Sequence, residues 1–201
     1  MKKLMFCFLV TILVINVIAC SNTPEERDST TKFENSVFIG DSITEGFAFN
    51  EILSKESVLA GPGATAGFTY DDIDVLVEKK PDNIFIMLGS CDILMPVDNP
   101  KELFRSDLNR LIDRLKEELP DSKIYLQSIT PVTDDAVEKE ARYEEIGEYN
   151  KILMELADEL SVSYVDIGAL ALENSDLYAE DGIHFKKEFY QLWLEYLSKL
   201  I

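Results

Sequence analysis

The chain holds a single histidine, His184, which closes the tetrapeptide Asp181-Gly182-Ile183-His184 near its C-terminus. Far upstream, Ser42 stands in Gly40-Asp41-Ser42, directly after the apolar run Val37-Phe38-Ile39. Nucleophilic acyl transfer needs a nucleophile, a base that takes its proton and an acid that holds the base in one tautomer. The sequence therefore predicts an acyl-transfer site made of Ser42, His184 and Asp181.

Ser42 is predicted to lie where a strand passes into a helix, and this position favours catalysis. The first backbone N–H groups of a helix have no intrahelical partner and can face the negative oxygen that forms when a serine attacks a carbonyl. Gly63, in Gly61-Pro62-Gly63, can bring a further N–H close to a substrate because glycine has no Cβ. Each segment alone has a plainer interpretation, as a turn with a serine cap or as a tight loop, so the prediction depends on their joint placement.

The elements that must position these residues are short apolar strands separated by amphipathic helices. Strands are predicted at residues 37–40, 58–60, 84–88, 124–126 and 164–166. They are apolar without alternation, which indicates burial on both faces and hence a parallel sheet with helices on each side. Long helices are predicted at about residues 99–119, 137–160 and 187–200. The predicted fold class is α/β, a three-layer α/β/α sandwich.

In such a sheet, ligands bind beyond the carboxyl ends of the strands. Ser42 follows the first predicted strand, Gly61-Pro62-Gly63 the second, and Gly89-Ser90-Cys91-Asp92 the third. All three segments should open at one edge of the sheet. The turn at residues 181–184 can join them there because it follows the loop after the fifth strand.

These segments resemble the sequence blocks of the SGNH/GDSL hydrolase superfamily over nearly the whole predicted domain. Ser42 matches the nucleophile of the Gly-Asp-Ser block, and Asp181 and His184 match the Asp-x-x-His block. Gly63 matches the glycine of the second block best, with Gly61 as the alternative. The resemblance implies a five-stranded parallel sheet in the flavodoxin-like order 2-1-3-4-5, and ester hydrolysis without a cofactor or a metal. It also implies an oxyanion hole that includes the N–H groups of Ser42 and Gly63.

One block departs from the family pattern. Where the family has Gly-x-Asn-Asp, this chain has Gly89-Ser90-Cys91-Asp92. The family asparagine donates its amide to the oxyanion, and a thiol is a far weaker donor. Loss of such a donor typically costs ~10²–10³ in rate in other hydrolases. We expect Cys91 to be a weak member of the oxyanion hole, unless Ser90 or another group substitutes, and Asp92 to be structural. In an alternative mechanism Cys91 is the nucleophile and His184 its base.

Residues 1–19 have the pattern of a bacterial lipoprotein signal peptide. Two lysines precede an apolar run that is short for a membrane-spanning helix, and Val17-Ile18-Ala19 before Cys20 resembles a lipobox. The resemblance implies cleavage before Cys20 and lipid attachment to its thiol. Residues 20–32 would be the lipidated cysteine and a polar tether, and residues 33–201 the hydrolase domain. The expected location is extracytoplasmic, anchored to the cell membrane by lipid; the alternatives are an uncleaved anchor or a plain secretory signal.

Charge and cysteine content exclude several classes of function. The chain has 38 acidic and 19 basic residues, a formal net charge of −19. Such a surface repels nucleic acid and other anionic polymers, so a neutral substrate is favoured. Of the three cysteines, Cys7 would leave with the signal peptide and Cys20 would be lipidated. Cys91 then remains alone, which excludes a disulfide framework in the domain and argues against a zinc site of Cys and His ligands.

Together these observations favour a serine esterase that cleaves short acyl esters, with O-acetyl groups on glycans as the expected substrates. The short-acyl preference follows from the resemblance and from a modest length that leaves little room for a lid. One alternative is an O-acyltransferase with the same three residues, in which a sugar hydroxyl replaces water. Another is a non-catalytic glycan-binding lipoprotein on the same scaffold, against which the intact Ser42, Asp181 and His184 argue. The sequence indicates no oligomeric state.

Overall fold

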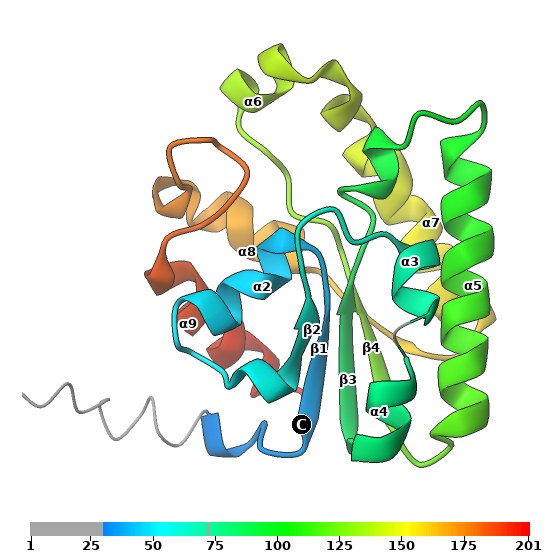
Figure 1. The fold of residues 1–201 in the computed structure, drawn as a ribbon. Coiled ribbons are helices and arrows are strands. Elements are labelled where there is room, and N and C mark those ends of the chain that lie inside the picture. The colour runs from blue at the N-terminus through cyan, green and yellow to red at the C-terminus, as the bar shows by residue number, and fades with distance from the viewer. Residues whose placement is uncertain (1–29, 72) are drawn as a thin grey trace, which may run out of the picture.

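The computed structural model describes residues 30–71 and 73–201. The predicted signal peptide, Cys20 and most of the tether lie outside the described residues. Within them, five parallel strands form one sheet in the order β2-β1-β3-β4-β5, with helices on both faces (Figure 1). The predicted sandwich and strand order are confirmed. The strands are β1 (Ser36–Gly40), β2 (Val58–Ala60), β3 (Asn83–Met87), β4 (Lys123–Gln127) and β5 (Ser163–Val165).

Burial on both faces of the sheet accounts for the unbroken apolar strands. In β1, Val37 and Ile39 belong to one buried cluster, whereas Phe38 between them belongs to the other. Successive side chains of a strand point to opposite faces, so a strand between two helical layers must be apolar at every position. The sheet is therefore the middle layer of a sandwich with two cores.

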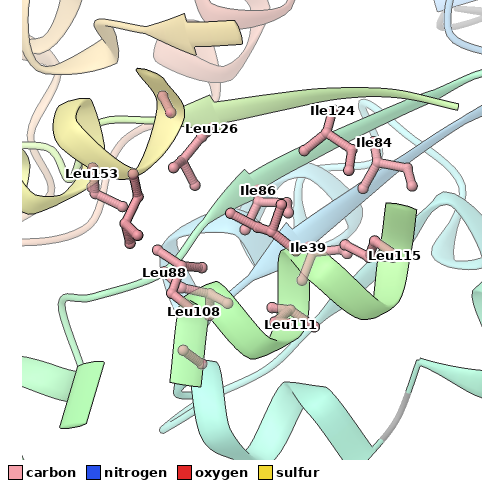
Figure 2. Packing of buried hydrophobic residues seen from close by; sticks show 14 of the residues in the cluster. Ile39, Ile84, Ile86, Leu88, Leu108, Leu111, Leu115, Ile124, Leu126 and Leu153 are labelled. Carbon is pink, nitrogen blue, oxygen red and sulfur yellow. The ribbon is translucent and has the colours of Figure 1, made fainter. Parts of the chain in front are cut away.

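Aliphatic side chains fill the first core, and Figure 2 shows them between the sheet and α5 (Pro100–Glu118). The strands supply Ile39, Ile86 and Leu126, against which Leu108 and Leu111 of α5 pack. The other helices that contribute to this cluster are α3 (Ala66–Asp71), α4 (Asp74–Lys79) and α7 (Ile146–Glu159).

Aromatic rings fill the second core. Phe85 of β3 stacks on Phe38 and on Tyr125 of β4, with ring centroids 4.8 and 4.7 Å apart. Trp193 is fully buried and donates its indole N–H to the side chain of Gln127 at 2.8 Å. The helices on this face are α2 (Ser42–Phe49), α8 (Ile167–Glu173) and α9 (Lys187–Leu197). Because α2 begins at Ser42, this core also supports the predicted nucleophile.

The prediction of one continuous helix at residues 137–160 is wrong. The chain forms α6 (Asp134–Lys139), the 3₁₀ turn η3 (Ala141–Glu145) and then α7. The break is at Glu140, whose backbone is extended and whose carboxylate accepts a hydrogen bond from the N–H of Arg142. The guanidinium of Arg142 binds the same carboxylate and also the carbonyl oxygen of Leu94. These bonds start a new turn in place of a continuous helix, and they draw η3 toward the segment after β3.

Three further 3₁₀ turns complete the described elements: η1 (Lys55–Ser57), η2 (Asp92–Leu94) and η4 (Ser175–Leu177). The fifth strand ends at Val165, one residue before the predicted end, because the Asp166 carboxylate caps α8 by accepting the N–H of Ala169. Among residues 30–71 and 73–201, none of the helices has the length and apolar character needed to cross a membrane.

Candidate active site

Ser42 is the first residue of α2, immediately beyond the carboxyl end of β1. Asp41 caps the helix, because its Oδ1 accepts the N–H of Ile43 at 2.9 Å. The strand and the cap hold the serine hydroxyl at the carboxyl edge of the sheet, as predicted. The N–H of Ser42 lies in the first turn, where an α-helix leaves backbone donors without an intrahelical partner.

The loop after β4 holds the turn that carries His184 in place. Thr133 donates its N–H to the carbonyl of Gly182 at 2.9 Å. Gly182 has φ +74°, and a Cβ there would lie 1.9 Å from the Thr133 hydroxyl oxygen. Only glycine fits this position without a shift of Thr133.

Within the turn, Asp181 binds three hydrogen-bond donors. Its Oδ1 accepts the N–H groups of Ile183 and His184 at 2.9 and 3.0 Å, and its Oδ2 lies 2.6 Å from His184 Nδ1. Partial burial alone would raise the pKa of the Asp181 carboxyl, but these hydrogen bonds outweigh it and leave the pKa below its usual value. The carboxylate therefore stays ionised and directs the Nδ1 proton of His184 toward itself.

The second ring nitrogen of His184 faces the serine. His184 Nε2 lies 2.8 Å from Ser42 Oγ, although the two residues are 142 positions apart in the sequence. With the proton on Nδ1, Nε2 can accept the hydroxyl proton of Ser42. The structure thus brings Ser42, His184 and Asp181 into one hydrogen-bonded chain.

The backbone hydrogen bonds distinguish Gly63 from Gly61. The N–H of Gly61 donates to the carbonyl of Gly40 at 3.4 Å and so extends the pairing of β2 with β1. Gly63 has φ +77°, and its N–H lies close enough to the Cys91 thiol to oppose the rise of the thiol pKa. Of the two glycines, Gly63 is the one whose N–H faces the site.

The Cys91 thiol lies beside the Gly63 N–H at the carboxyl end of β3. Burial raises the pKa of this thiol to about 11, and the charge of Asp41 adds to the effect, so the thiol keeps its proton at neutral pH. The base that could remove the proton, His184 Nε2, is hydrogen-bonded to Ser42 instead. Both observations argue against Cys91 as the nucleophile.

Ser90 does not replace the missing asparagine. Its hydroxyl is buried and donates to Oδ2 of Asp41, the carboxylate whose other oxygen caps α2. Burial raises the pKa of the Asp41 carboxyl, and the hydrogen bond from Ser90 acts in the opposite direction. The Ser90–Asp41 pair ties the loop after β3 to the turn of Ser42, a link that sequence reasoning missed. The strand order could have indicated this link, because β1 and β3 are neighbours and their carboxyl ends must lie side by side.

Asp92 links the loops after β2 and β3. Its Oδ1 accepts the N–H of Ala66 at 3.1 Å, which fixes the start of α3 against η2. Its Oδ2 is buried without a hydrogen-bond partner among the described residues. Burial raises the pKa of the Asp92 carboxyl to about 7. Asp92 thus holds the Gly63 segment near Cys91, in agreement with the structural role expected.

Sequence reasoning also missed Tyr143 and Arg142 of η3. Tyr143 is half-buried, and burial, followed by electrostatic interactions with Cys91, Glu140 and Asp41, raises the pKa of its phenol. η3 therefore stands near the Cys91 side of the site. No signal in the sequence alone places it there, because the placement depends on the bond from Arg142 to Leu94.

The aromatic residues near the predicted blocks are not grouped around Ser42. Phe47 is fully buried in the second core, Phe49 is 83% exposed, and Tyr70 lies under the guanidinium groups of α5. Tyr178 donates its hydroxyl to the Pro131 carbonyl at 2.6 Å. In the described part of the chain, no cluster of three or more His, Cys, Asp and Glu residues could hold a metal ion.

Comparison with solved structures shows which fold the chain shares with known proteins. Among solved structures, the chain is similar to a GDSL-like lipase from Bacteroides thetaiotaomicron, with 17% identity over 85% of this chain and 88% of that one (TM-score 0.69). It is similar to a lipase/acylhydrolase from Enterococcus faecalis, with 18% identity over 84% and 95% (TM-score 0.67). It is also similar to the acetyl xylan esterase AlAXEase, with 16% identity over 83% and 99% (TM-score 0.63). At these identities the likeness shows a shared fold.

No curated protein matches the chain by sequence. Residues 38–192 match the GDSL-like Lipase/Acylhydrolase family, a range that begins in β1 and ends in α9 and contains Ser42, Asp181 and His184. The chain therefore belongs to the GDSL-like lipase/acylhydrolase family and is an ester hydrolase of the GDSL type.

Proposed function

We propose that this hydrolase is a serine esterase that cleaves short acyl esters, among them O-acetyl groups on glycans, through an acyl-enzyme. The observation that carries the proposal is the hydrogen-bonded chain from Ser42 Oγ through His184 to Asp181, with contacts of 2.8 and 2.6 Å. These distances suit proton transfer from a nucleophile to a base and the orientation of that base by a carboxylate.

In the first half of the reaction Ser42 Oγ attacks the ester carbonyl carbon while its proton passes to His184 Nε2. Asp181 stabilises the imidazolium that forms and keeps its ring in place. The tetrahedral intermediate collapses when His184 gives the proton to the leaving alcohol, and the acyl group stays on Ser42. In the second half a water molecule repeats the sequence: His184 takes its proton, its oxygen attacks the acyl carbon, and Ser42 regains the proton.

The negative oxygen of the intermediate is assigned to the backbone N–H groups of Ser42 and Gly63, with the Cys91 thiol beside them. In the free enzyme the Gly63 N–H lies near the Cys91 sulfur. Sulfur is a weak acceptor, so this N–H remains available to an oxyanion. A backbone hole of this kind stabilises charge that develops only in the transition state.

Two observations support a neutral, acetylated substrate. The chain carries a formal net charge of −19, which disfavours anionic substrates. Its fold is shared with an acetyl xylan esterase, a protein whose name specifies an acetylated glycan.

The nucleophile is tested with a fluorophosphonate probe and p-nitrophenyl acetate. Ser42→Ala should abolish labelling and lower kcat by ~10³-fold or more, and His184→Ala should lower kcat by a similar amount because the three residues act as a unit. Ser163→Ala, at the exposed start of β5, is the matched control and should keep full activity. Labelling confined to Cys91, with Ser42→Ala still active, would reject the serine mechanism.

We also propose that the enzyme acts outside the cytoplasm, held to the cell membrane by lipid on Cys20. The support is the pattern of the sequence: a basic start, an apolar run and a cysteine after Val17-Ile18-Ala19. Residues 20–32 would then tether the domain to the membrane surface.

A further inference from the structure

A cavity of about 310 Å³ opens beside the Gly61-Pro62-Gly63 segment, and the proposed reaction does not account for it. Its volume lies in the range of small-molecule sites. We call it the Phe68 cavity. Its walls come from the carboxyl ends of β1 and β2, the loop that joins β2 to α3 (Figure 1), and α3 itself; the lining residues are Gly40, Leu59, Ala60, Gly61, Pro62, Gly63, Ala64, Phe68 and Thr69.

Two lining residues connect the Phe68 cavity to the proposed active site. Gly40 is the last residue of β1, and Asp41 alone separates it from Ser42. Gly63 lies near the Cys91 thiol, and its N–H is assigned to the oxyanion. The cavity therefore borders the proposed oxyanion hole. In a sugar ester the first ring carbon is only two bonds from the carbonyl carbon, so the sugar must lie close to any group that holds the carbonyl oxygen.

Glycine residues leave one wall of the cavity without side chains. A Cβ built on Gly61 or on Gly63 would meet nothing within 4 Å, so the space beside both residues is open. Pro62 between them is exposed. This wall thus offers peptide groups to solvent, and peptide carbonyls can accept hydrogen bonds from hydroxyl groups of a ligand.

Phe68 supplies an aromatic surface that solvent reaches. Ala66 and Thr69 are buried and hold α3 against the domain, whereas the Phe68 side chain between them is 63% exposed. Exposure of a large aromatic ring to water is unfavourable, and a ligand with an apolar face would relieve it. The ring is therefore available to a ligand in the cavity without any movement of the core.

The chemistry of the lining favours a neutral, amphipathic ligand. None of the described residues that line the cavity is charged, in a chain of which 28% of the residues are charged. An acyl chain laid on an open, exposed ring would keep much of its own apolar surface in water. A sugar ring instead packs the CH groups of one face on an aromatic ring, while its hydroxyls remain in water or bind the peptide groups of the loop. The lining therefore suits a sugar better than an acyl chain.

We propose that the Phe68 cavity binds a sugar unit of the glycan that carries the acyl group, with the Phe68 ring stacked on that sugar. This inference rests on the proposed esterase function and adds a specificity-determining residue to it. The cavity would select glycan esters over simple esters, because only a glycan reaches both Ser42 and Phe68.

The test compares two substrates on the full-length protein, with acid release followed by titration. Ethyl acetate reports the ester site alone, because its alcohol is small and carries no ring that could stack on Phe68. Acetylated xylo-oligosaccharides report the ester site and the cavity together. Phe68→Ala should raise KM for the oligosaccharide about three- to tenfold. Phe68→Tyr keeps an aromatic ring and should stay within about twofold of wild type. Both variants should leave kcat and KM for ethyl acetate within about twofold, since the ester site is untouched.

A second variant fills the cavity instead of removing its ring. Gly61→Leu adds a side chain at an open position whose φ lies outside the left-handed region, and it should raise KM for the oligosaccharide at least as much as Phe68→Ala. Phe49→Ala, at a residue that is 83% exposed, and Gly147→Leu, at another open position, make the same chemical changes outside the cavity. These two controls should leave KM for both substrates unchanged.

Two kinetic results would overturn the inference. One is that Phe68→Ala and Gly61→Leu affect both substrates equally or affect neither. The other is that they raise KM for ethyl butyrate and not for the oligosaccharide, since the cavity would then hold the acyl chain.

Calorimetry with unacetylated xylo-oligosaccharides tests the same site without turnover. Wild type should bind the sugar, and Phe68→Ala should bind it about three- to tenfold more weakly. Absence of binding to wild type would overturn the inference even if ethyl acetate is cleaved. Sugar binding that depends on Phe68, in a protein that cleaves no ester, would instead reject the proposed function and leave the sugar site standing.

Discussion

At the scale of single residues, Cys91 determines how the proposed oxyanion hole differs from that of the family. The thiol occupies the place of an amide donor and lies near the Gly63 N–H. A thiol is a far weaker donor than an amide, so it adds little to the stabilisation of a negative oxygen. The backbone N–H groups of Ser42 and Gly63 would then provide most of that stabilisation.

Cys91→Asn should therefore raise kcat for p-nitrophenyl acetate, since the amide strengthens its contact as charge develops in the transition state. One such donor accounts for up to ~10²–10³ in rate in other hydrolases, and the gain will be smaller if the loop fits only a small side chain. Steady-state kinetics measures this change in kcat, with Cys91→Ser as the control. If Cys91→Asn folds with unchanged stability and loses kcat, Cys91 is not a degraded oxyanion donor.

Asp92 makes stability depend on pH in a direction opposite to that of most carboxylates. Its pKa is about 7 in the folded protein and near the ordinary 3.8 when unfolded. Between these values the folded chain holds a proton that the unfolded chain has lost, so the free energy of unfolding falls as pH rises through this window. The loss is complete above about pH 7 and amounts to roughly 4 kcal/mol at most.

Asp92→Asn should remove this pH dependence. Relative to wild type, the variant should gain melting temperature between pH 5 and pH 8, because the amide never ionises. Thermal unfolding of both proteins at the two pH values measures the effect. Asp121→Asn, at an exposed turn, should show no such gain. A difference in melting temperature that is the same at both pH values would contradict a buried, ionising Asp92.

At the scale of elements, α2 and α9 position Ser42 through one close contact. Tyr190 of α9 is buried and donates its hydroxyl to the Ile43 carbonyl at 2.9 Å. Its ring passes over Gly46, where a Cβ would lie 2.0 Å from the Tyr190 hydroxyl oxygen and 2.1 Å from Cζ. Gly46 is therefore required by packing rather than by backbone conformation.

Gly46→Ala should destabilise the fold by about 1–3 kcal/mol, because the added methyl overpacks the contact between the two helices. Gly147→Ala is a matched control in α7, where a Cβ meets nothing within 4 Å. That change should stabilise by about 0.5–1 kcal/mol, as alanine normally does in a helix. Urea unfolding of both variants measures the change in the free energy of unfolding. A change of the same sign in both would show that packing at Gly46 is unimportant.

At the scale of the whole molecule, an acidic domain and a lipid anchor would work together. Removal of residues 1–19 takes away two lysines and leaves 38 acidic residues, so the mature domain would be still more acidic than the chain as translated. Such a domain is repelled by an anionic membrane surface. Retention at the membrane would then depend on the acyl chains, with the tether holding the domain off the surface.

Cys20→Ala should block incorporation of labelled fatty acid and release the protein from the membrane fraction or leave its precursor unprocessed. Two or more acyl chains hold a protein stably on a membrane, whereas an anionic membrane surface repels an acidic domain. Cys91→Ala is the control and should leave lipid labelling intact. Wild-type protein that is freely soluble outside the cell, with Cys20 unmodified, would exclude the anchor.

The sequence by itself determined the layers of this protein and the identity of its principal site residues. Strands that are buried on both faces must be apolar throughout, so five apolar runs were enough to predict a parallel sheet between helices. The sequence was enough to identify Ser42, the single histidine and Asp181, because each lies in a short segment whose local chemistry is distinctive. It also identified Cys91, which stands where the family pattern has asparagine.

Only the tertiary structure decided which groups meet across the carboxyl edge of the sheet. The choice of Gly63 over Gly61 depends on which group each N–H lies near, and the pairing of Ser90 with Asp41 depends on β1 lying beside β3. The placement of η3 beside η2 depends on Arg142 reaching Leu94, 48 residues away in the sequence. Periodicity and turn chemistry are local properties of a chain, whereas these contacts result from competition among distant partners for the same donors and acceptors.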